Sequence, residues 1–270
     1  MADDALKSDP FAKFKAVQRE GWALFAPLAA FTTPTAAALV NFAGVKKDEA
    51  VLDVCCGTGV VAITAYRRGA RVSALDLSPV LLEEARKNAS ILKAAVDFKE
   101  GDVEALPYKD ASFDVVLSQF GHMFAPRPEI ALKEMLRVLK PGGRIAFSTW
   151  PPELIIGRVF ALVSQHVQPP PGAGAPGQWG DVTVVRERLK GLAGDIAFHR
   201  DDMLFPALSP QHYRASLELT AGPVIKAVET LAGQPENLQK FRGDIESIAE
   251  QYFSDNVVRQ SYLMTRAIKN

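Results

Sequence analysis

An acidic residue followed by a glycine-rich loop could hold a nucleotide-like ligand in this chain. The hydrophobic segment at 50–54 predicts a short buried strand, and Gly57 and Gly59 follow it directly. Glycines allow the backbone to turn tightly and to approach a bound molecule closely. Residues 57–62 also match the glycine pattern of dinucleotide sites, although such turns are common after strands. The loop therefore indicates a cofactor site without naming the cofactor.

Two acids help to distinguish the possible cofactors. Asp76 ends the next expected strand, about twenty residues after the loop, where a carboxylate can bind ribose hydroxyls. This placement suits NAD and S-adenosylmethionine (SAM) equally. Asp53 stands immediately before the loop, where it would repel a pyrophosphate and attract the ammonium group of SAM. SAM is therefore favoured, and two simpler roles stay open: Asp53 could bind only turn amides, and Asp76 could cap the next helix with Ser78.

The elements that position these residues alternate regularly. Hydrophobic runs predict strands at 50–54, 71–76, 96–100, 113–118 and 144–149, separated by helices at 60–68, 79–89 and 129–139. This order predicts an α/β fold with a doubly wound parallel sheet, whose ligands bind beyond the carboxyl ends of the strands. Late strands at 196–205 and 257–268 would complete a mostly parallel, seven-stranded Rossmann-like sheet.

Three regions are expected along the chain. Residues 1–45 form an N-terminal helical lid, with two helices joined near Thr32–Pro34 and Thr33 as an N-cap. Residues 46–150 form the cofactor-binding core. Residues 151–270 complete the sheet and carry a helical insertion at about 206–256, on the side of the second substrate. The proline- and glycine-rich stretch at 168–180 predicts a loop.

Several motifs, in order, resemble those of class I SAM-dependent methyltransferases. Residues 51–59 resemble motif I, residues 74–78 the ribose-binding strand end, and residues 100–107 the motif after the third strand. Residues 113–116 and 136–143 resemble the fourth strand and the turn before the fifth. The resemblance covers about residues 30 to 150 and is greatest to the methyltransferase type 11 group, which contains ubiquinone and menaquinone biosynthesis methyltransferases.

This resemblance implies methyl transfer from SAM to a small-molecule acceptor by in-line displacement, with S-adenosylhomocysteine as the product. The loop would hold the methionine part, Asp76 the ribose, and Asp102 the adenine amino group. Leu77 would pack on adenine, and Gln119 would face the methyl-transfer position. The implied cofactor-binding residues are Asp53, Cys55, Gly57, Thr58, Gly59, Asp76, Leu77, Asp102, Val103 and Gln119.

Other side chains could contact the acceptor. His122 follows the fourth strand and could act as a general base, with a hydrogen-bonded loop histidine as the plainer interpretation. The uncharged residue that relatives often carry at this position does not support a base. Aromatic side chains could line an apolar acceptor pocket or belong to the core. The candidates for the acceptor pocket are Trp22, Phe31, Phe124 and Trp179.

The composition restricts the partners. Lys and Arg total 31, as do Asp and Glu, so no nucleic-acid partner is expected. The two cysteines are adjacent and the four histidines scattered, which predicts no disulfide framework and no metal site. We interpret both cysteines as compact loop side chains.

Residues 21–45 carry no charge, but Pro27 and Pro34 argue against a membrane span. Peripheral membrane contact stays open, as does the oligomeric state, and a cytoplasmic enzyme is expected. Three alternatives remain: an NAD-dependent oxidoreductase, a methyltransferase acting on protein or RNA, and a non-catalytic SAM-binding protein.

Overall fold

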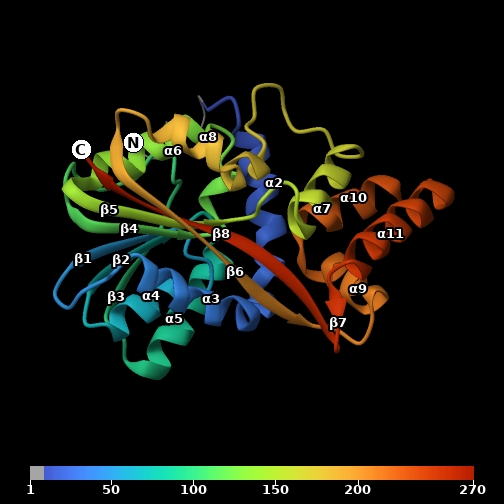
Figure 1. Cartoon of the computed structure of the whole chain (residues 1–270), viewed down its shortest axis with the longest axis horizontal. Helices are drawn as coiled ribbons and strands as arrows, with labels where there is room; N and C mark the ends of the chain where they lie inside the picture. Colours follow the sequence, from blue (N-terminus) through green and yellow to red (C-terminus); the bar gives the residue numbers. More distant parts are fainter. Residues whose placement is uncertain (1–8) are drawn as a thin grey trace.

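The computed structural model describes residues 9–270, and a single twisted sheet organises them (Figure 1). The strand order is β3-β2-β1-β4-β5-β8-β6. The first five of these pair in parallel, and β8 runs antiparallel to both β5 and β6. The strands are β1 (Ala50–Val54), β2 (Arg71–Asp76), β3 (Val96–Glu100), β4 (Phe113–Gln119), β5 (Leu139–Thr149), β6 (Ala193–Pro206), β7 (Phe253–Ser254) and β8 (Val257–Lys269).

Helices cover both faces of the sheet (Figure 1). In this view α3, α4 and α5 lie on one face, and α6 and α8 lie on the other. The continuous apolar runs of β1 and β4 fit this arrangement, because parallel strands are buried on both sides. The helices are α2 (Ala12–Trp22), α3 (Ala29–Phe42), α4 (Val60–Arg67), α5 (Pro79–Leu92), α6 (Pro128–Val138), α7 (Ile155–Ser164), α8 (Val182–Leu189), α9 (Pro210–Thr220), α10 (Gly222–Leu231) and α11 (Pro235–Glu250).

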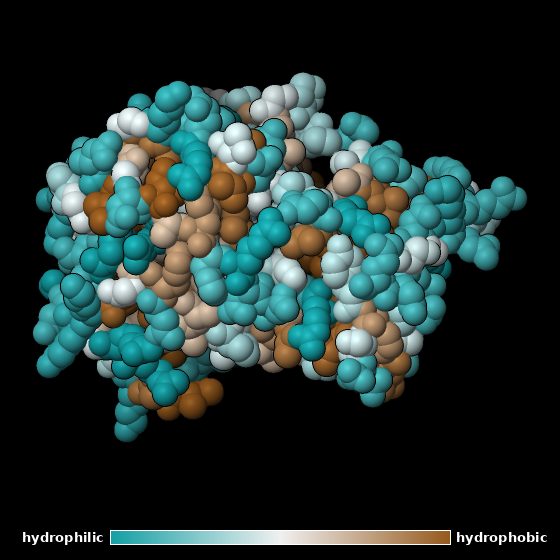
Figure 2. All heavy atoms as spheres, viewed as in Figure 1, coloured by the Kyte–Doolittle hydropathy of each residue, from teal (hydrophilic) through white to brown (hydrophobic). Residues whose placement is uncertain are grey.

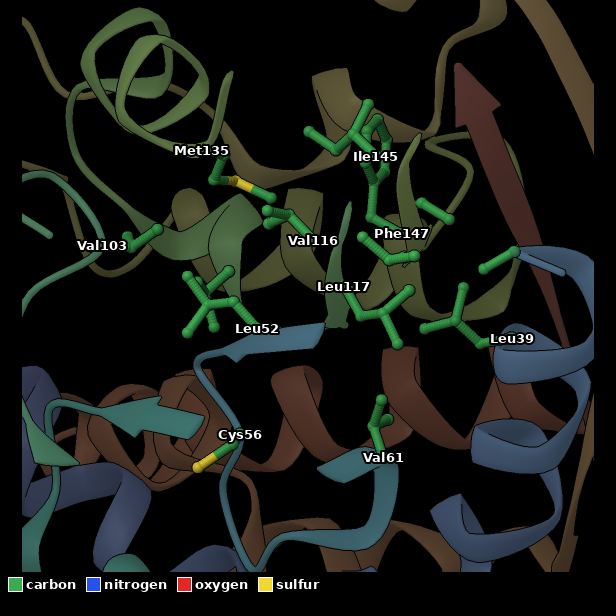
Figure 3. Packing of buried hydrophobic residues seen from close by; sticks show 14 of the residues in the cluster. Leu39, Leu52, Cys56, Val61, Val103, Val116, Leu117, Met135, Ile145 and Phe147 are labelled. Carbon is green, nitrogen blue, oxygen red and sulfur yellow. The ribbon is translucent and has the colours of Figure 1, made fainter. Parts of the chain in front are cut away.

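The main hydrophobic core lies between the sheet and the helices that cover it. Leu52 of β1, Leu117 of β4 and Phe147 of β5 are fully buried and belong to one hydrophobic cluster, together with Leu39 of α3 (Figure 3). Burial of one such side chain stabilises the folded state by about 1.5–3 kcal/mol. The core therefore holds the ends of the strands in register.

The outer surface differs from the core. The face in Figure 2 is largely hydrophilic, with separate hydrophobic patches between the polar side chains.

A second core supports the helical insertion that follows β6. It gathers residues of α7, α9, α10 and α11, with Phe205 of β6 and Val258 of β8. β6 and β8 are long, and they extend beyond the other strands toward α9 (Figure 1). The insertion is therefore attached to the sheet through these two strands.

The fold agrees with the predicted class and differs in two details. The sheet has eight strands instead of seven, because the two-residue β7 pairs with β8.

The joint between the two N-terminal helices lies at a 3-10 helix, η1 (Ala23–Leu28), which contains Pro27. Pro34 instead lies inside α3, and Thr33 is no N-cap: its hydroxyl donates to the Ala29 carbonyl. Proline is most disruptive where its missing N–H and ring cannot be accommodated, and here the helical path changes at Pro27.

The helical tract Ala12–Phe42 is long and apolar enough to cross a membrane by length and composition alone. Its second half does not face outward, because Leu39 is fully buried and Val40 nearly so. Both residues belong to the main core. This packing supports the interpretation of α3 as part of the α/β fold.

Candidate cofactor and acceptor site

The loop between β1 and α4 has the shape that its glycines predict. Cys55, Gly57 and Gly59 all have positive φ angles, of 55°, 53° and 81°. A side chain placed on Gly57 would meet no atom within 4 Å, so the space in front of this residue is open. Three loop amides are already used, since Cys56 N donates to Leu75 O, Gly57 N to Asp76 Oδ2 and Gly59 N to Cys56 O. The loop is therefore a formed turn that leaves room for a ligand at Gly57.

Asp53 lies at the end of β1 and is 1% exposed. Its Oδ2 accepts a hydrogen bond of 3.0 Å from the Ala62 amide, and its buried Oδ1 has no partner among the described residues. Burial raises the pKa of Asp53 well above its usual range. A buried carboxylate with a free oxygen is costly by itself and is suited to a cationic partner.

Asp76, at the end of β2, organises the neighbouring backbone. Its two carboxylate oxygens accept hydrogen bonds of 2.8 Å from the amides of Gly57 and Ser78. Burial raises the pKa of Asp76, and these amides act in the opposite direction. Ser78 also caps α5 by accepting from the Leu81 amide. Asp76 thus fixes the loop and the start of α5, and it also lines the cavity described below.

Asp102, after β3, is bound by a lysine from the N-terminal helix. Lys15 Nζ lies 2.6 Å from carboxylate oxygens of Asp102, Asp9 and Glu104. These three acids could hold a metal ion by geometry, but the ammonium group of Lys15 contacts all of them. Burial lowers the pKa of Lys15, yet its hydrogen bonds to the acids hold that pKa above its usual value. The cluster connects α2 to the loop after β3.

A cavity of about 200 Å³ opens between these strand ends and the helices α2, α7, α9 and α10. Asp76, Leu77, Asp102 and Val103 line one part of it. A smaller cavity of about 50 Å³ shares Cys55, Gly57 and Gln119 with the first and is also lined by Asp53 and Thr58. Gly59 lines neither cavity, because it packs against Ala85 and Phe98.

Gln119, the last residue of β4, lies where the two cavities meet. Its Nε2 donates to the Thr32 carbonyl and to Thr35 Oγ1. These bonds direct the amide nitrogen toward α3, and Oε1 is buried without a partner among the described residues. The side chain therefore carries a free acceptor atom at this junction.

Three of the four aromatic candidates line the larger cavity: Trp22, Phe31 and Phe124. The rings of Trp22 and Phe124 are 4.6 Å apart, and the wall continues through Phe160, 5.6 Å from Phe124. The fourth candidate does not belong to this wall. Trp179 is 1% exposed and packs against Phe147 of the central strand β5, with Arg188 over its ring.

His122 faces the core instead of the cavity. Its side chain is fully buried, and its ring lies 4.6 Å from that of Phe147 and 4.7 Å from that of Trp179. Neither ring nitrogen has a hydrogen-bond partner among the described residues. Burial lowers the pKa of His122 to about 3. The plainer interpretation, a hydrogen-bonded loop histidine, also differs from the structure in this respect. This geometry gives the imidazole no access to an acceptor.

The two cysteines are free thiols. Burial raises the pKa of both well above the usual range, so they stay protonated. The Cβ of Cys55 lies close against Gly121, where a side chain would collide with it. The close approach to Gly121 leaves no room for a larger residue at position 121 beside Cys55.

Lys15 and Gln260 are cavity residues that the sequence patterns did not reveal. For Lys15 a signal existed: Phe11, Lys15, Gln18 and Trp22 recur at helical spacing, so the lysine shares a face with aromatic residues. For Gln260 no local signal existed, because it lies in an otherwise ordinary strand.

Comparison with known proteins places this site in a family. The methyltransferase domain family matches residues 52–147. A ubiquinone/menaquinone biosynthesis C-methyltransferase of Ruegeria sp. is 33% identical over 168 residues, 60% of this chain and 67% of that enzyme. An uncharacterised protein of Mycobacterium tuberculosis is 33% identical over 257 residues, 93% of each chain. A phosphoethanolamine N-methyltransferase of Haemonchus contortus, solved with SAM, has a TM-score of 0.56 at 20% identity, covering 87% of this chain and 52% of that one.

Fold and site define a Rossmann-like, cofactor-dependent transferase. The chain belongs to the class I SAM-dependent methyltransferases and resembles those of ubiquinone and menaquinone biosynthesis. Its cofactor is SAM. The alternative of an NAD-dependent oxidoreductase is therefore set aside.

Proposed function

We propose that this methyltransferase transfers the methyl group of SAM to an apolar small molecule, quinone-like or lipid-like. The observation that carries the proposal is the larger cavity, which runs from Asp76 and Asp102 to an aromatic chamber formed by Trp22, Phe31 and Phe124. A cofactor and an apolar acceptor could occupy the two parts of one continuous space.

The residues present fit SAM in three ways. The free Oδ1 of Asp53 suits the ammonium group of the methionine part. The open space at Gly57 allows a ligand to approach the backbone. Asp76 and Asp102 are spaced along the strand ends as ribose and adenine contacts, with Leu77 and Val103 beside them.

When bound, SAM supplies an electrophilic methyl group on a sulfonium. The chain's own part is to hold the acceptor in line and to exclude water. The described residues that line the cavity include no histidine and no tyrosine. We therefore assign catalysis to positioning by the aromatic chamber and by Gln119, without a histidine base.

We also propose that α2, η1, α9 and α10 act as the lid expected at residues 1–45 and 206–256. Trp22 and Phe25 come from the N-terminal part, and Leu217 and Val224 from the insertion, and all four line the cavity. Gly21 and Gly222 approach closely, since the side chain that either residue lacks would meet the backbone of the other. The two parts thus meet over the acceptor chamber.

Production of S-adenosylhomocysteine tests the function. Purified protein is incubated with methyl-labelled SAM and, in separate reactions, a reduced naphthoquinone, a phenolic lipid, a peptide mixture or RNA. Label in the quinol or lipid supports the proposal. Label confined to peptide or RNA, or tight binding of SAM without transfer to any of the four, contradicts the proposed acceptor class.

A further inference from the structure

We infer that Gln260 binds a hydroxyl group of the acceptor at the end of the cavity opposite the cofactor. The acceptor is then an elongated apolar molecule that carries a hydroxyl far from the methylated atom. This inference rests on the proposed function and adds a specificity residue to it.

Gln260 is a buried polar residue in an apolar wall. It lies in β8 opposite Met203 of β6, is 2% exposed, and lines the larger cavity. Around it the wall is formed by Met203, Phe205 and Leu217. A polar side chain in such a wall sets ligand orientation, because few other groups there can bind a polar atom.

Only half of the Gln260 amide is used. Its Nε2 donates a hydrogen bond of 2.9 Å to Tyr213 Oη. No described residue donates a hydrogen bond to its Oε1. Tyr213 is fully buried, and burial raises the pKa of its phenol, so its hydroxyl stays neutral and accepts the hydrogen bond from Nε2. Unlike Oε1 of Gln119, this oxygen is not fully enclosed, so it is open to the cavity that Gln260 lines and can accept from a bound donor.

The surroundings select a neutral donor. Phe31 and Phe205 have ring centroids 4.5 Å apart, and Phe205 meets Tyr213 at 5.1 Å. This aromatic row leads from the chamber to Gln260. A cation would lose its hydration here without gaining an opposite charge. A hydroxyl can donate to Oε1 at much lower cost.

The register of the sheet gives the distance between Gln119 and Gln260, which the acceptor must span. Gln119 pairs with Ser148, and Ser148 pairs with Met264 of β8. Gln260 precedes Met264 by four residues, which is roughly 13 Å along the strand, and β8 lies roughly 10 Å across the sheet from β4. The two backbone positions are therefore on the order of 16 Å apart. A single ring does not span this distance, but a ring with a side chain does.

A matched pair of probes tests the inference: 6-phenylhexan-1-ol and its methyl ether, which lacks the donor. Their dissociation constants are measured by calorimetry with saturating S-adenosylhomocysteine. We expect the wild type to prefer the alcohol about tenfold, the usual worth of one buried hydrogen bond. Gln260→Met, which keeps the shape and removes the amide, should abolish this preference.

Two further variants complete the design. Gln211→Met makes the same change at an exposed position of α9 and should keep the preference. Tyr213→Phe removes the hydrogen-bond partner of the Gln260 amide and should reduce the preference for the alcohol. Equal affinity of the wild type for both probes, binding of neither, or an unchanged preference in Gln260→Met would overturn the inference. The binding of S-adenosylhomocysteine, measured alone, reports separately on the cofactor site and on the folding of each variant.

Discussion

Lys15 Nζ and Asp102 Oδ2 lie 2.6 Å apart, although the residues are separated by 87 positions in the chain. Lys15 is 5% exposed and also contacts Asp9 and Glu104. The same helix carries Gln18 and Trp22 into the cavity wall. This ion pair therefore attaches the part of the cavity wall that α2 forms to the residue that we assign to adenine.

Replacing Lys15 tests this attachment. Lys15→Met removes the ammonium group that contacts three neighbouring carboxylates. Because these buried charges then lose a partner, the free energy of unfolding should fall by about 3 kcal/mol. The substitution should also weaken SAM binding, because Asp102 loses the group that holds it. Chemical denaturation and calorimetry measure the two effects. The control Lys13→Met, on the exposed side of α2, should change neither, and a similar loss in both variants would contradict the assignment.

Asp53→Asn should separate cofactor binding from stability. The amide oxygen can still accept from Ala62, and the cost of burying a carboxylate is removed, so the melting temperature should stay equal or rise. Affinity for SAM should fall at least about tenfold, because the ammonium group loses its counter-charge. Asp114→Asn is the control for SAM affinity alone, since Asp114 also accepts from a backbone amide, that of Ala50, but pairs in addition with Lys140.

The pH dependence of SAM binding gives a second test of Asp53. In the free protein burial raises the pKa of Asp53, so the protonated form persists above the usual value of 3.8. Cofactor binding favours the ionised form of Asp53. The affinity for SAM should therefore increase as the pH rises through the raised pKa of this carboxyl group. Asp53→Asn should remove that increase. A slope that persists in the variant would show that another group is responsible.

Gly57→Ala should damage binding more than stability. Gly57 has a φ of 53°, where a side chain costs about 1 kcal/mol, and the new methyl group would point into open space at the cofactor loop. Gly142→Ala introduces the same kind of strain at a φ of 72°, also without a collision. Equal thermal destabilisation with SAM affinity lost only in Gly57→Ala would support the assignment. Equal affinity in both would refute it.

His122→Leu should leave methyl transfer within about twofold of wild type, since the ring does not reach the cavity. Stability should respond instead. The pKa of about 3 lies below the usual 6.5, so the folded state resists protonation and loses stability as the pH falls below 6.5. From pH 7 to 5 the wild type should lose about 2 kcal/mol that the variant keeps.

Denaturation at the two pH values measures this difference, and His212→Leu, at an exposed site on α9, should behave like the wild type. A large loss of methyl transfer in His122→Leu with intact stability would restore the general-base hypothesis.

The gathering of three acids on the candidate cofactor side could be predicted because these residues stand near the ends of strands. Asp53, Asp76 and Asp102 stand at or within two residues of the ends of β1, β2 and β3, and parallel strands bring such ends to one edge of a sheet. The acceptor side could not be predicted in this way. Trp22 stands in a predicted helix and Trp179 in a predicted loop, and neither local pattern shows that the first lines the cavity and the second packs in the core.

The sequence by itself determined the strand and helix order, the glycine loop and the row of acids, since all of these follow from local periodicity and turn chemistry. Only the tertiary structure decided that Lys15 meets Asp102, that His122 turns into the core, and that Gln260 joins the cavity of Gln119. The physical reason is the same in each case. These placements depend on long-range packing, which selects among side-chain directions that the local sequence permits equally.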